Sequence, residues 1–445
     1  FKIKLIQMKH IILLFVTALP FLATSQNTVY FMERLPQKVL LNPAFVPEMN
    51  FHLGLPGIGG VTGNLYNSGF NYNELVYFMN NLSDPNYNPD DFVHGMGDFN
   101  RFNAEVQINI LSFGFRTKKG GYFSFNIAAN HTTNFRTDSD IAYLLADVDE
   151  IQDEDFPIQI DGVDLISNTN LTYSATYSRK INDNLTLGIS PKLNFNQFGI
   201  KTDDIGYRIE LEETTYSKEY TQFPIGEVLL GMPVEINPEA VDGNELNLDM
   251  GLFPDNWTDS HSLKDIHRNT SFTLDLGATY NFRKWMFSAS ILNIGSSAWQ
   301  KNAYRLNGSN DVVQISEEEK TRIGIPAKIY LGAIRQFAPR WNYGLALSNT
   351  FLNSGSVPSA TFSLNGYAGK MLSTSISYTA GYKFNNIGLG FRLRFFPGFD
   401  LFMVTDNILQ ALNYKNAHRL SAAFGINFAL GVNDEFDTPV NEAEL

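Results

Sequence analysis

The chain contains no cysteine, and this absence removes several classes of site at once. No disulfide bond, no thiolate metal site and no lipid-modified N-terminal cysteine can form. The chain is also poor in charge, because charged residues make up 18% of its 445 residues, against about 25% in soluble domains. The formal net charge is −13 and the basic residues are scattered, so nucleic acid is not an expected partner.

Long apolar runs and catalytic motifs are missing as well. After the start of the chain, no run of about 18 apolar residues predicts a membrane helix. His261 and His267 lie six residues apart, which is not the spacing of a zinc-protease motif. His131, near Thr132 and Ser139, is the best pairing of a base with a hydroxyl, but a lone histidine at a sheet rim is more often structural. We predict no enzyme activity, no cofactor and no metal site.

The first residues form a targeting segment. A basic flank precedes a short apolar core, and the small residues Ala23-Thr24-Ser25 follow it. This order predicts a secretory signal peptide over residues 1–25, cleaved near Ser25, with residues 1–7 upstream of the true start at Met8. A membrane anchor is the alternative, although the apolar core is short for a span. We expect the mature protein to lie beyond the inner membrane.

Alternation of apolar and polar side chains dominates the chain from residue 51 onward. In residues 419–430, Leu420, Phe424 and Leu430 fall on one face, and small or polar residues such as Asn427 fall on the other. Such a strand suits the wall of a membrane barrel, between lipid and a wet lumen, or a half-buried strand of a soluble sandwich. Strands are expected at 51–66, 103–117, 121–131, 169–181, 185–200, 205–214, 271–283, 285–295, 325–338, 341–352, 358–369, 371–384, 387–396, 398–405 and 417–430.

The lengths of the connections favour the barrel. Short links are expected at 118–120, 182–184, 283–284 and 338–340, and long segments at 132–168, 215–270 and 296–324. Outer-membrane barrels have short periplasmic turns and longer outer loops. Trp285 and Trp341 each open a strand after a short turn, where interfacial indole rings prefer to sit. We predict an all-β fold, a transmembrane antiparallel β-barrel of about 14 strands (roughly 12–16), over residues 51–430.

Two local irregularities are expected in this wall. The apolar phase of residues 104–116 flips between Ile110 and Leu111, which predicts a β-bulge. The stretch Gly57-Ile58-Gly59-Gly60 resembles a nucleotide loop only superficially, and it predicts a strand entry or bend.

Residues 26–50 are interpreted as an N-terminal plug or hatch. Pro36, Pro43 and Pro47 preclude a long helix, and the apolar residues around them suit packing inside another structure. The alternative is a short helix lying against a sheet edge. The candidate hatch residues are Asn42, Pro43, Ala44 and Phe45.

The strand phases place several cations toward the lumen. They are Lys192, Lys328, Arg392, Arg394 and Arg419. Clustered cations in a lumen could attract an anionic head group or a carboxylate. The alternative is that they pair with lumen acids such as Glu105 and Asp275. Tyr330, Ile334 and Met371 are expected to add apolar lumen surface.

Two acidic stretches lie outside the strands. Residues 138–164 carry many carboxylates and no Lys or Arg, which raises the question of cation binding. A solvated surface loop is the favoured interpretation, because the spacing is not that of an EF-hand. Residues 431–445 form an acidic periplasmic tail, read either as a partner contact or as a disordered end.

Three motifs carry a family resemblance. They are Val39-Leu40-Leu41-Asn42-Pro43-Ala44-Phe45, Ser288-Ala289-Ser290-Ile291-Leu292-Asn293-Ile294-Gly295-Ser296, and Phe399-Asp400-Leu401-Phe402-Met403-Val404-Thr405-Asp406-Asn407 with the final Phe424-Gly425-Ile426-Asn427 strand. They resemble segments of uncharacterised Bacteroidota outer-membrane barrels and, more distantly, of FadL-like barrels and barrels associated with type 9 secretion. The resemblance implies about 14 strands and an N-terminal segment inside or under the barrel. It carries over no catalytic residue.

These features lead to a functional expectation. The protein is expected in the outer membrane of a Gram-negative bacterium, in contact with outer-membrane lipid. It would act either as a FadL-like channel for small hydrophobic or amphipathic compounds or as a structural component of an envelope or secretion complex. The alternative is a β-rich, periplasm-facing protein that caps or accompanies a secretion translocon.

Overall fold

The computed structural model describes most of the region from residue 26 to residue 432. The described residues are 26–81, 87, 92, 95–97, 99–118, 120–139, 158–213, 218–231, 269–299, 301–307, 312–316, 321–323, 325–352, 355–381, 384–396 and 398–432. The predicted signal peptide, residues 140–157 of the acidic stretch and residues 433–445 of the tail lie outside them.

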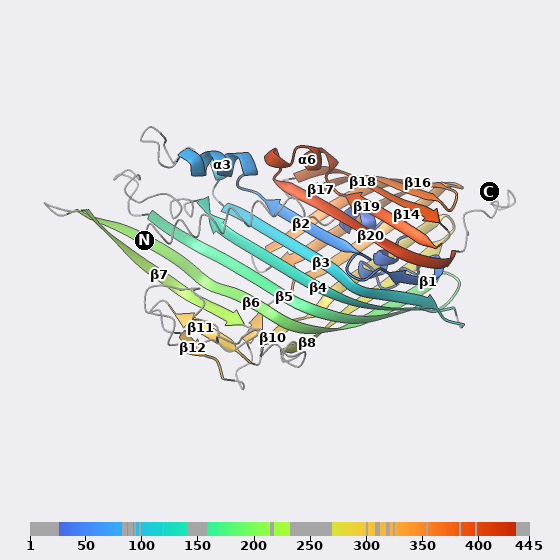
Figure 1. Cartoon of the computed structure of the whole chain (residues 1–445), viewed down its shortest axis with the longest axis horizontal. Coiled ribbons are helices and arrows are strands. Elements are labelled where there is room, and N and C mark those ends of the chain that lie inside the picture. The colour runs from blue at the N-terminus through green and yellow to red at the C-terminus, as the bar shows by residue number, and fades with distance from the viewer. Residues whose placement is uncertain are drawn as a thin grey trace.

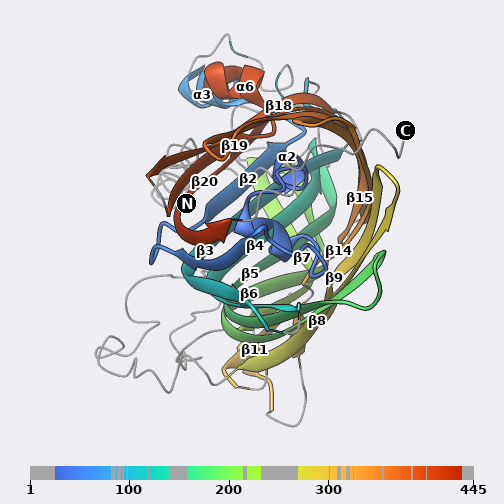
Figure 2. The same cartoon turned by 90° about the vertical axis from the view of Figure 1, so that its right-hand side faces the viewer.

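Antiparallel strands close into a barrel (Figures 1 and 2). In order around the wall they are β1 (Met49–Gly54) with β2 (Val61–Asn67), β3 (Phe99–Arg116), β4 (Tyr122–Asp138), β5 (Ile158–Lys180), β6 (Leu185–Glu213), β8 (Thr270–Phe282), β9 (Trp285–Gly295), β14 (Ala327–Ala338), β15 (Trp341–Leu352), β16 (Gly355–Ala368), β17 (Leu372–Gly381), β18 (Phe384–Phe396), β19 (Phe399–Thr405) and β20 (Arg419–Val432). Because β1 and β2 both pair with β20 and β3, they share one position, and the ring has 14 positions. The predicted transmembrane barrel is confirmed.

The wall has an apolar outer face and a polar inner face. On β20, Phe424 and Leu430 point outward and are 41% and 47% exposed, whereas Ala423 and Asn427 point inward and are fully buried. Apolar side chains of nearly every other wall strand are exposed in the same way. A closed ring leaves no strand edge with unpaired backbone groups, which is what hydrocarbon requires of a spanning structure. The direction of each predicted face on residues 419–430 is therefore correct.

One end of the barrel, here called the short-turn end, carries the tight links. Short links join β3 to β4, β5 to β6, β8 to β9 and β14 to β15, as predicted. The opposite end, called the long-loop end, is less uniform than expected, because β15–β16 and β17–β18 are joined there by two residues each. The predicted difference in loop length between the two ends is thus found mainly in the N-terminal half of the barrel wall.

Two irregularities of the wall match their predictions. The register between β3 and β4 shifts between Asn109 and Leu111, so Ile110 is the extra residue of a bulge. The expected strand 51–66 is in fact two strands, since residues 55–60 leave the sheet between β1 and β2. Gly57 has φ +74°, a backbone conformation that glycine adopts without steric cost.

The expected strand 205–214 was a wrong division. β6 runs without a break to Glu213, and β7 (Lys218–Gly231) pairs with its distal half inside the stretch interpreted as a loop. β11 (Ala303–Asn307) pairs with β7, and β12 (Val312–Gln314) pairs with β11. β10 (Ser297–Trp299) and β13 (Thr321–Ile323) form a separate pair beside them. The apolar residues of β7 do not keep one phase, since Phe223 and Ile225 alternate in one phase and Val228 and Leu230 in the other, so the sequence pattern missed this strand.

The helices are short. α2 (Gln26–Val29) and the 3-10 helix η2 (Pro36–Leu40) lie within the ring of strands, as Figure 2 shows for α2. α3 (Tyr72–Asn81), α6 (Ile408–Leu412) and the 3-10 helix η9 (Tyr414–Asn416) belong to the long-loop end, and Figure 2 shows α3 and α6 outside the ring. Among the described residues, no helix is long and apolar enough to cross a membrane.

Candidate functional site

Residues 27–48, here called the inserted segment, fill the middle of the barrel lumen. Tyr30, Phe31 and Leu35 are at most 1% exposed and form one cluster with Tyr330 and Phe402 of the wall. The rings of Tyr30 and Tyr330 are stacked, with centroids 5.5 Å apart. Complete burial of each such side chain contributes roughly 1.5–3 kcal/mol. The polar lumen expected from the strand pattern therefore contains an apolar core supplied by the N-terminal residues.

Hydrogen bonds attach the segment to the wall on several sides. The Tyr30 hydroxyl is 2.8 Å from Ser288 Oγ of β9, and Gln37 Nε2 donates to Asn427 Oδ1 of β20 at 2.8 Å. Further bonds come from Ser178 of β5 to the Pro43 carbonyl, from Ser290 of β9 to the Leu41 carbonyl, and from Arg116 of β3 to the Pro47 carbonyl. Small hydroxyl side chains on the inner face thus satisfy backbone groups of a segment that has little regular structure.

The upper end of the segment, nearest the long-loop end, is held by one carboxylate. Asp406 accepts hydrogen bonds from the backbone N–H groups of Asn27 and Thr28 at 3.1 and 2.8 Å, and from the Thr28 hydroxyl at 2.6 Å. The Thr28 hydroxyl also lies 2.8 Å from Ser377 Oγ of β17. Asp406 is 3% exposed, so these bonds are shielded from water.

The lower end is held by close packing against glycines. A Cβ atom on Gly277 would lie 2.0 Å from the Asn42 amide oxygen, and one on Gly188 would lie 2.1 Å from the Pro43 carbonyl carbon. No side chain fits at either position, since real Cβ contacts are not this short. Asn42 Nδ2 donates to the carbonyls of Ala278 and Ala289 at 3.4 and 3.2 Å. The candidate hatch residues Asn42, Pro43, Ala44 and Phe45 are thus all buried against the wall, and their action as a hatch stays a prediction.

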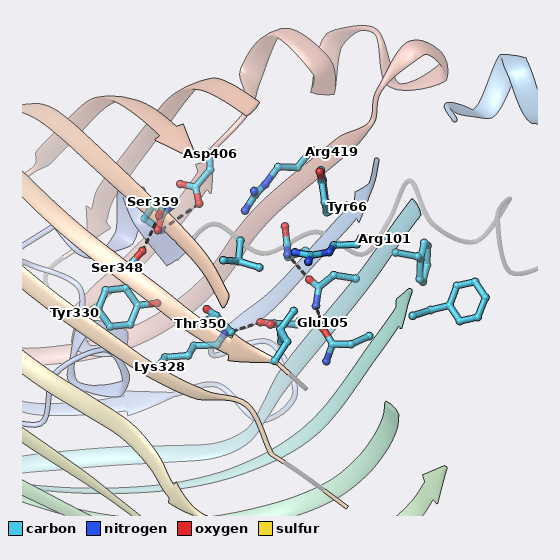
Figure 3. Close-up of a pocket in the computed structure, with 18 residues that line it drawn as sticks. Tyr66, Arg101, Glu105, Lys328, Tyr330, Ser348, Thr350, Ser359, Asp406 and Arg419 are labelled. Atoms are coloured by element: carbon cyan, nitrogen blue, oxygen red, sulfur yellow. Dashed lines mark hydrogen bonds and ion pairs between the residues drawn. The ribbon is translucent and has the colours of Figure 1, made fainter. Parts of the chain in front are cut away.

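An upper cavity of about 110 Å³ lies above the segment, toward the long-loop end (Figure 3). Apolar side chains and cations share its lining, which includes Tyr66, Phe102, Tyr330, Arg101 and Arg419. The guanidinium of Arg419 lies 6.0 Å from the centre of the Tyr66 ring, within cation–π range. Glu105 and Asp406 also line it, so the cavity offers an apolar surface together with charges of both signs.

A middle cavity of about 140 Å³ lies beside the segment and has a different lining. Amides and hydroxyls from β3 to β6 predominate, among them Asn126, Asn130, Asn170, Thr172 and Asn194. Several are bonded to one another, as in the 2.8 Å bond from the Thr172 hydroxyl to Asn194 Oδ1. Asn126 is 7% exposed, and its Oδ1 has no hydrogen-bond partner among the residues that the structure describes. This surface suits water or a neutral polar solute.

A lower cavity of about 540 Å³ lies beneath the segment, toward the short-turn end. Glu33, Lys38 and Glu48 contribute to its lining. Burial raises the pKa of Glu48 to about 7, although the nearby Arg34 guanidinium, 3.1 Å away, opposes that shift. Burial also raises the pKa of Glu33 and lowers the pKa of Lys38. The charged groups of the segment thus collect on its lower side.

The predicted lumen cations all point inward, and most lie in ion pairs. Lys192 lies 2.6 Å from Asp275, and Lys328 lies 2.7 Å from Glu105. Arg392 and Arg394 share Asp400, at 2.6 and 2.7 Å, near the short-turn end. Arg419 lines the upper cavity. The two lysines therefore pair with lumen acids, which was the alternative to their attracting an anionic group.

Two of the three apolar residues expected in the lumen lie there, and the pairing considered for His131 is not observed. Tyr330 and Ile334 are buried in the lumen, but Met371 is 61% exposed in the tight link between β16 and β17, so its assignment was wrong. Among the described residues, His131 makes no hydrogen bond to the hydroxyl of Thr132 or Ser139. Its ring nitrogens instead lie 2.9 Å from the hydroxyls of Thr169 and Thr133, an arrangement in which no carboxylate orients the imidazole as in a hydrolytic triad.

Sequence reasoning missed Asp406, which holds the upper end, and Tyr30, which lies in the apolar core of the lumen. Asp406 was quoted only as part of a motif, and Tyr30 was not singled out. The signal available for Asp406 was a carboxylate followed by Asn407 at the end of a strand, the sort of pair that caps a helix. Within the described part of the chain, no group of three or more His, Asp or Glu side chains could hold a metal ion.

Comparison with solved structures finds several chains similar to this one. Similar structures include the Ralstonia pickettii toluene transporter TbuX (TM-score 0.43, 10% identity, 92% of this chain and 99% of that one) and a Pseudomonas aeruginosa FadL homologue (0.46, 10%, 93% and 99%). The Pseudomonas putida toluene transporter TodX is similar to the same degree (0.40, 11%, 88% and 91%). Because these TM-scores are below 0.5, the evidence for the barrel fold is the strand pairing of the chain itself.

Family membership is clearer than structural likeness. No curated protein matches the sequence. One family model matches it over residues 43–321 and 310–406, which is most of the barrel and the lower part of the inserted segment. The chain belongs to the family of unknown function DUF5723.

Proposed function

We propose that this protein is an outer-membrane channel for small amphipathic compounds and that the inserted segment is its hatch. The position of the segment carries the proposal. It lies between an upper and a lower cavity, and it is bonded to strands on several sides of the ring. No catalytic chemistry is needed for this role, and we propose that the protein is not an enzyme.

The lining of the upper cavity indicates the class of solute. Tyr66, Phe102 and Tyr330 offer flat apolar surfaces, which suit the apolar part of a small molecule. Arg101 and Arg419 lie among them and favour a polar or negatively charged group. A solute with both an apolar and a polar part would contact both kinds of surface.

The outward face supports the proposed location. Exposed side chains of β14–β17 include Leu331, Leu345, Phe362 and Ile376, all at least 48% exposed. Exposure of such a continuous apolar surface to water is unfavourable in free energy, whereas contact with lipid chains is not. Together with the expected signal peptide, this supports the outer membrane of a Gram-negative cell. Membership of the Bacteroidota and an association with type 9 secretion stay predictions.

Passage requires the segment to move. Its apolar core makes permanent removal costly, but each of its hydrogen bonds is worth only about 0.5–1.5 kcal/mol net. A partial displacement that breaks a few bonds at one end is therefore accessible without unfolding the barrel. Such a displacement would join the cavities above and below it.

A disulfide lock tests the proposal. Because the hydroxyl oxygens of Thr28 and Ser377 lie 2.8 Å apart and the chain has no cysteine, the double variant Thr28→Cys/Ser377→Cys can form one defined disulfide. We expect the oxidised variant to show less conductance in planar bilayers, and less uptake in liposomes, than the same protein after reduction. Thr28→Cys alone is the control and should not respond to reductant.

The result separates the two candidate roles. Equal conductance of the locked and reduced forms would contradict a hatch. In that case the alternative roles, a structural component of an envelope or secretion complex or a periplasm-facing cap, become the better explanation. If the locked protein, extracted in mild detergent, is recovered together with a stable partner, the role as a structural component of a complex is supported.

A further inference from the structure

The ion pair between Glu105 and Lys328 joins opposite walls of the barrel. Glu105 belongs to β3 and Lys328 to β14. Around the ring, β4, β5, β6, β8 and β9 lie between them on one side, and β15 to β20 with β1/β2 lie between them on the other. Neither strand neighbours the other, so the bond between their side chains passes through the lumen. Figure 3 shows the two side chains approaching from opposite ribbons.

Such a contact requires the barrel to be narrow at this level. A circular ring of 14 strands, spaced about 4.8 Å apart and tilted by ~40°, would measure ~28 Å between facing backbones. Extended lysine and glutamate side chains in contact span roughly half of that distance. The 2.7 Å separation of Lys328 Nζ and Glu105 Oε2 therefore means that β3 and β14 approach each other closely here.

The pair also stands at the boundary between two kinds of lining. Glu105 and Lys328 line both the upper and the middle cavity. Above them the lining combines amides and hydroxyls with aromatic rings and guanidinium groups, and beside them on the other side it consists mainly of amides and hydroxyls without aromatic rings other than that of His131. The side chains are 15% and 13% exposed, so most of each charge is shielded from bulk water.

We propose that the Glu105–Lys328 pair is a charged bar across the lumen that determines which solutes pass between the two cavities. The inference rests on the proposed channel function. The two charges neutralise each other, so an inorganic ion gains little from either one while both are engaged. A solute can pass only when the two side chains separate. Separation leaves two buried charges without each other, so its free-energy cost is low only if groups of the solute take the place of the lost ion pair.

The bar is mechanically linked to the hatch through one strand. Lys328 and Tyr330 are successive inward residues of β14, and Tyr330 stacks on Tyr30 of the inserted segment. Gly332, the next inward residue, leaves no room for a Cβ atom beside the Tyr30 hydroxyl, which would lie 2.6 Å away. Movement of the segment therefore changes the packing of the strand that presents Lys328.

Charge variants of the full-length protein test the selectivity. In a salt gradient across a planar bilayer, Glu105→Gln leaves the lysine unbalanced and should shift the reversal potential toward anion selectivity. Lys328→Gln should shift it toward cation selectivity. The double variant Glu105→Lys/Lys328→Glu restores a pair and should return the reversal potential to that of the wild type. A reversal potential that stays unchanged in both single variants of a conducting protein would overturn the proposal.

A cross-link tests the geometry without any need for conduction. Glu105→Cys/Lys328→Cys should be joined by a bifunctional maleimide that spans the removed side chains. Glu105→Cys/Ile329→Cys, whose second cysteine points to the outer face, should not be joined. Absence of the cross-link in the first variant overturns the bar. A cross-linked protein that conducts in no variant overturns the channel function and, with it, the selectivity assigned to the pair.

Discussion

The two ends of the inserted segment are attached to the barrel by different means. At the upper end, Asp406 holds Asn27 and Thr28 through three hydrogen bonds. At the lower end, Asn42 and its neighbours fit against glycines that leave no space for a side chain. Hydrogen bonds and close packing against glycines occur at both ends, since Gly388 also leaves no room for a Cβ atom beside Thr28 and Ser178 donates to the Pro43 carbonyl. The difference is that one side chain, Asp406, accepts all three bonds at the upper end, whereas the lower bonds come from several strands. We infer that the upper end releases first when the segment moves, because the loss of one acceptor breaks all three of its bonds.

The largest expected effect comes from filling the lower contact. Gly277→Val places atoms where the Asn42 amide now lies, so the lower end must leave the wall. Overpacking of this kind costs about 1–3 kcal/mol, and the bonds of Asn42 to the Ala278 and Ala289 carbonyls are lost in addition. A nitroxide label at Val46→Cys should become markedly more mobile by electron paramagnetic resonance.

The neighbouring residue supplies the matched control. Ala278 points to the outer face of the same strand, so Ala278→Val should leave the label at position 46 immobile. A label that is equally immobile in both variants would mean that the glycine contact does not hold the lower end, and the contrast between the two ends would disappear.

A smaller effect is expected at the upper end. Asp406→Ala removes the acceptor for the N–H groups of Asn27 and Thr28, at a cost of about 1–2 kcal/mol. A nitroxide label at Asn27→Cys should gain mobility, while one at Val46→Cys should not. Asp406→Asn keeps one acceptor oxygen and should lie between the alanine variant and the wild type. Equal loosening of both ends would show that the segment is released as one unit.

A third effect is a dependence on pH at the lower end. Because the pKa of Glu48 is raised to about 7 in the docked segment, docking is favoured fully below the ordinary pKa of about 4.5, and this contribution is lost as the pH rises through about 7. The label at position 46 should therefore become more mobile between pH 5 and pH 8.

Glu48→Gln should flatten this response. Any slope that remains reports Glu33, whose raised pKa acts in the same direction, and Lys38, whose lowered pKa acts in the opposite direction. An undiminished slope in Glu48→Gln would assign the pH dependence to those two groups instead.

Much of the wall could be predicted because lipid and lumen impose opposite requirements on alternate residues. That rule placed Phe424 outside and Asn427 inside, and it located the bulge at Ile110. It failed for β7, whose apolar residues change phase between Ile225 and Val228 and so do not alternate along the whole strand. It also failed for Met371, because a residue in a tight link is not bound by the alternation of the adjoining strands.

The interior could be predicted only in part. A charge on an inward position can be recognised from the strand phase, as Lys192 and Lys328 show. The inward acids Glu105 and Asp275 can be recognised in the same way, but which cation each one pairs with cannot when the two lie on far walls, because no local spacing connects β3 with β14. The bond between Thr28 and Asp406 could not be predicted for the same reason, because the two residues are 378 positions apart in the sequence. These contacts follow from how the ring closes, not from any one strand.

The length of β6 has a practical consequence. At 29 residues and about 3.3 Å per residue, it is ~95 Å long, while the apolar band of an outer-membrane barrel is only ~25 Å tall. A large part of it, with β7 beside it, must stand clear of the bilayer. A short peptide epitope inserted between Glu213 and Lys218 would accordingly be within reach of an antibody on intact cells if the long loops face outward, and it would be hidden if they do not. One immunofluorescence image would fix the orientation of the barrel.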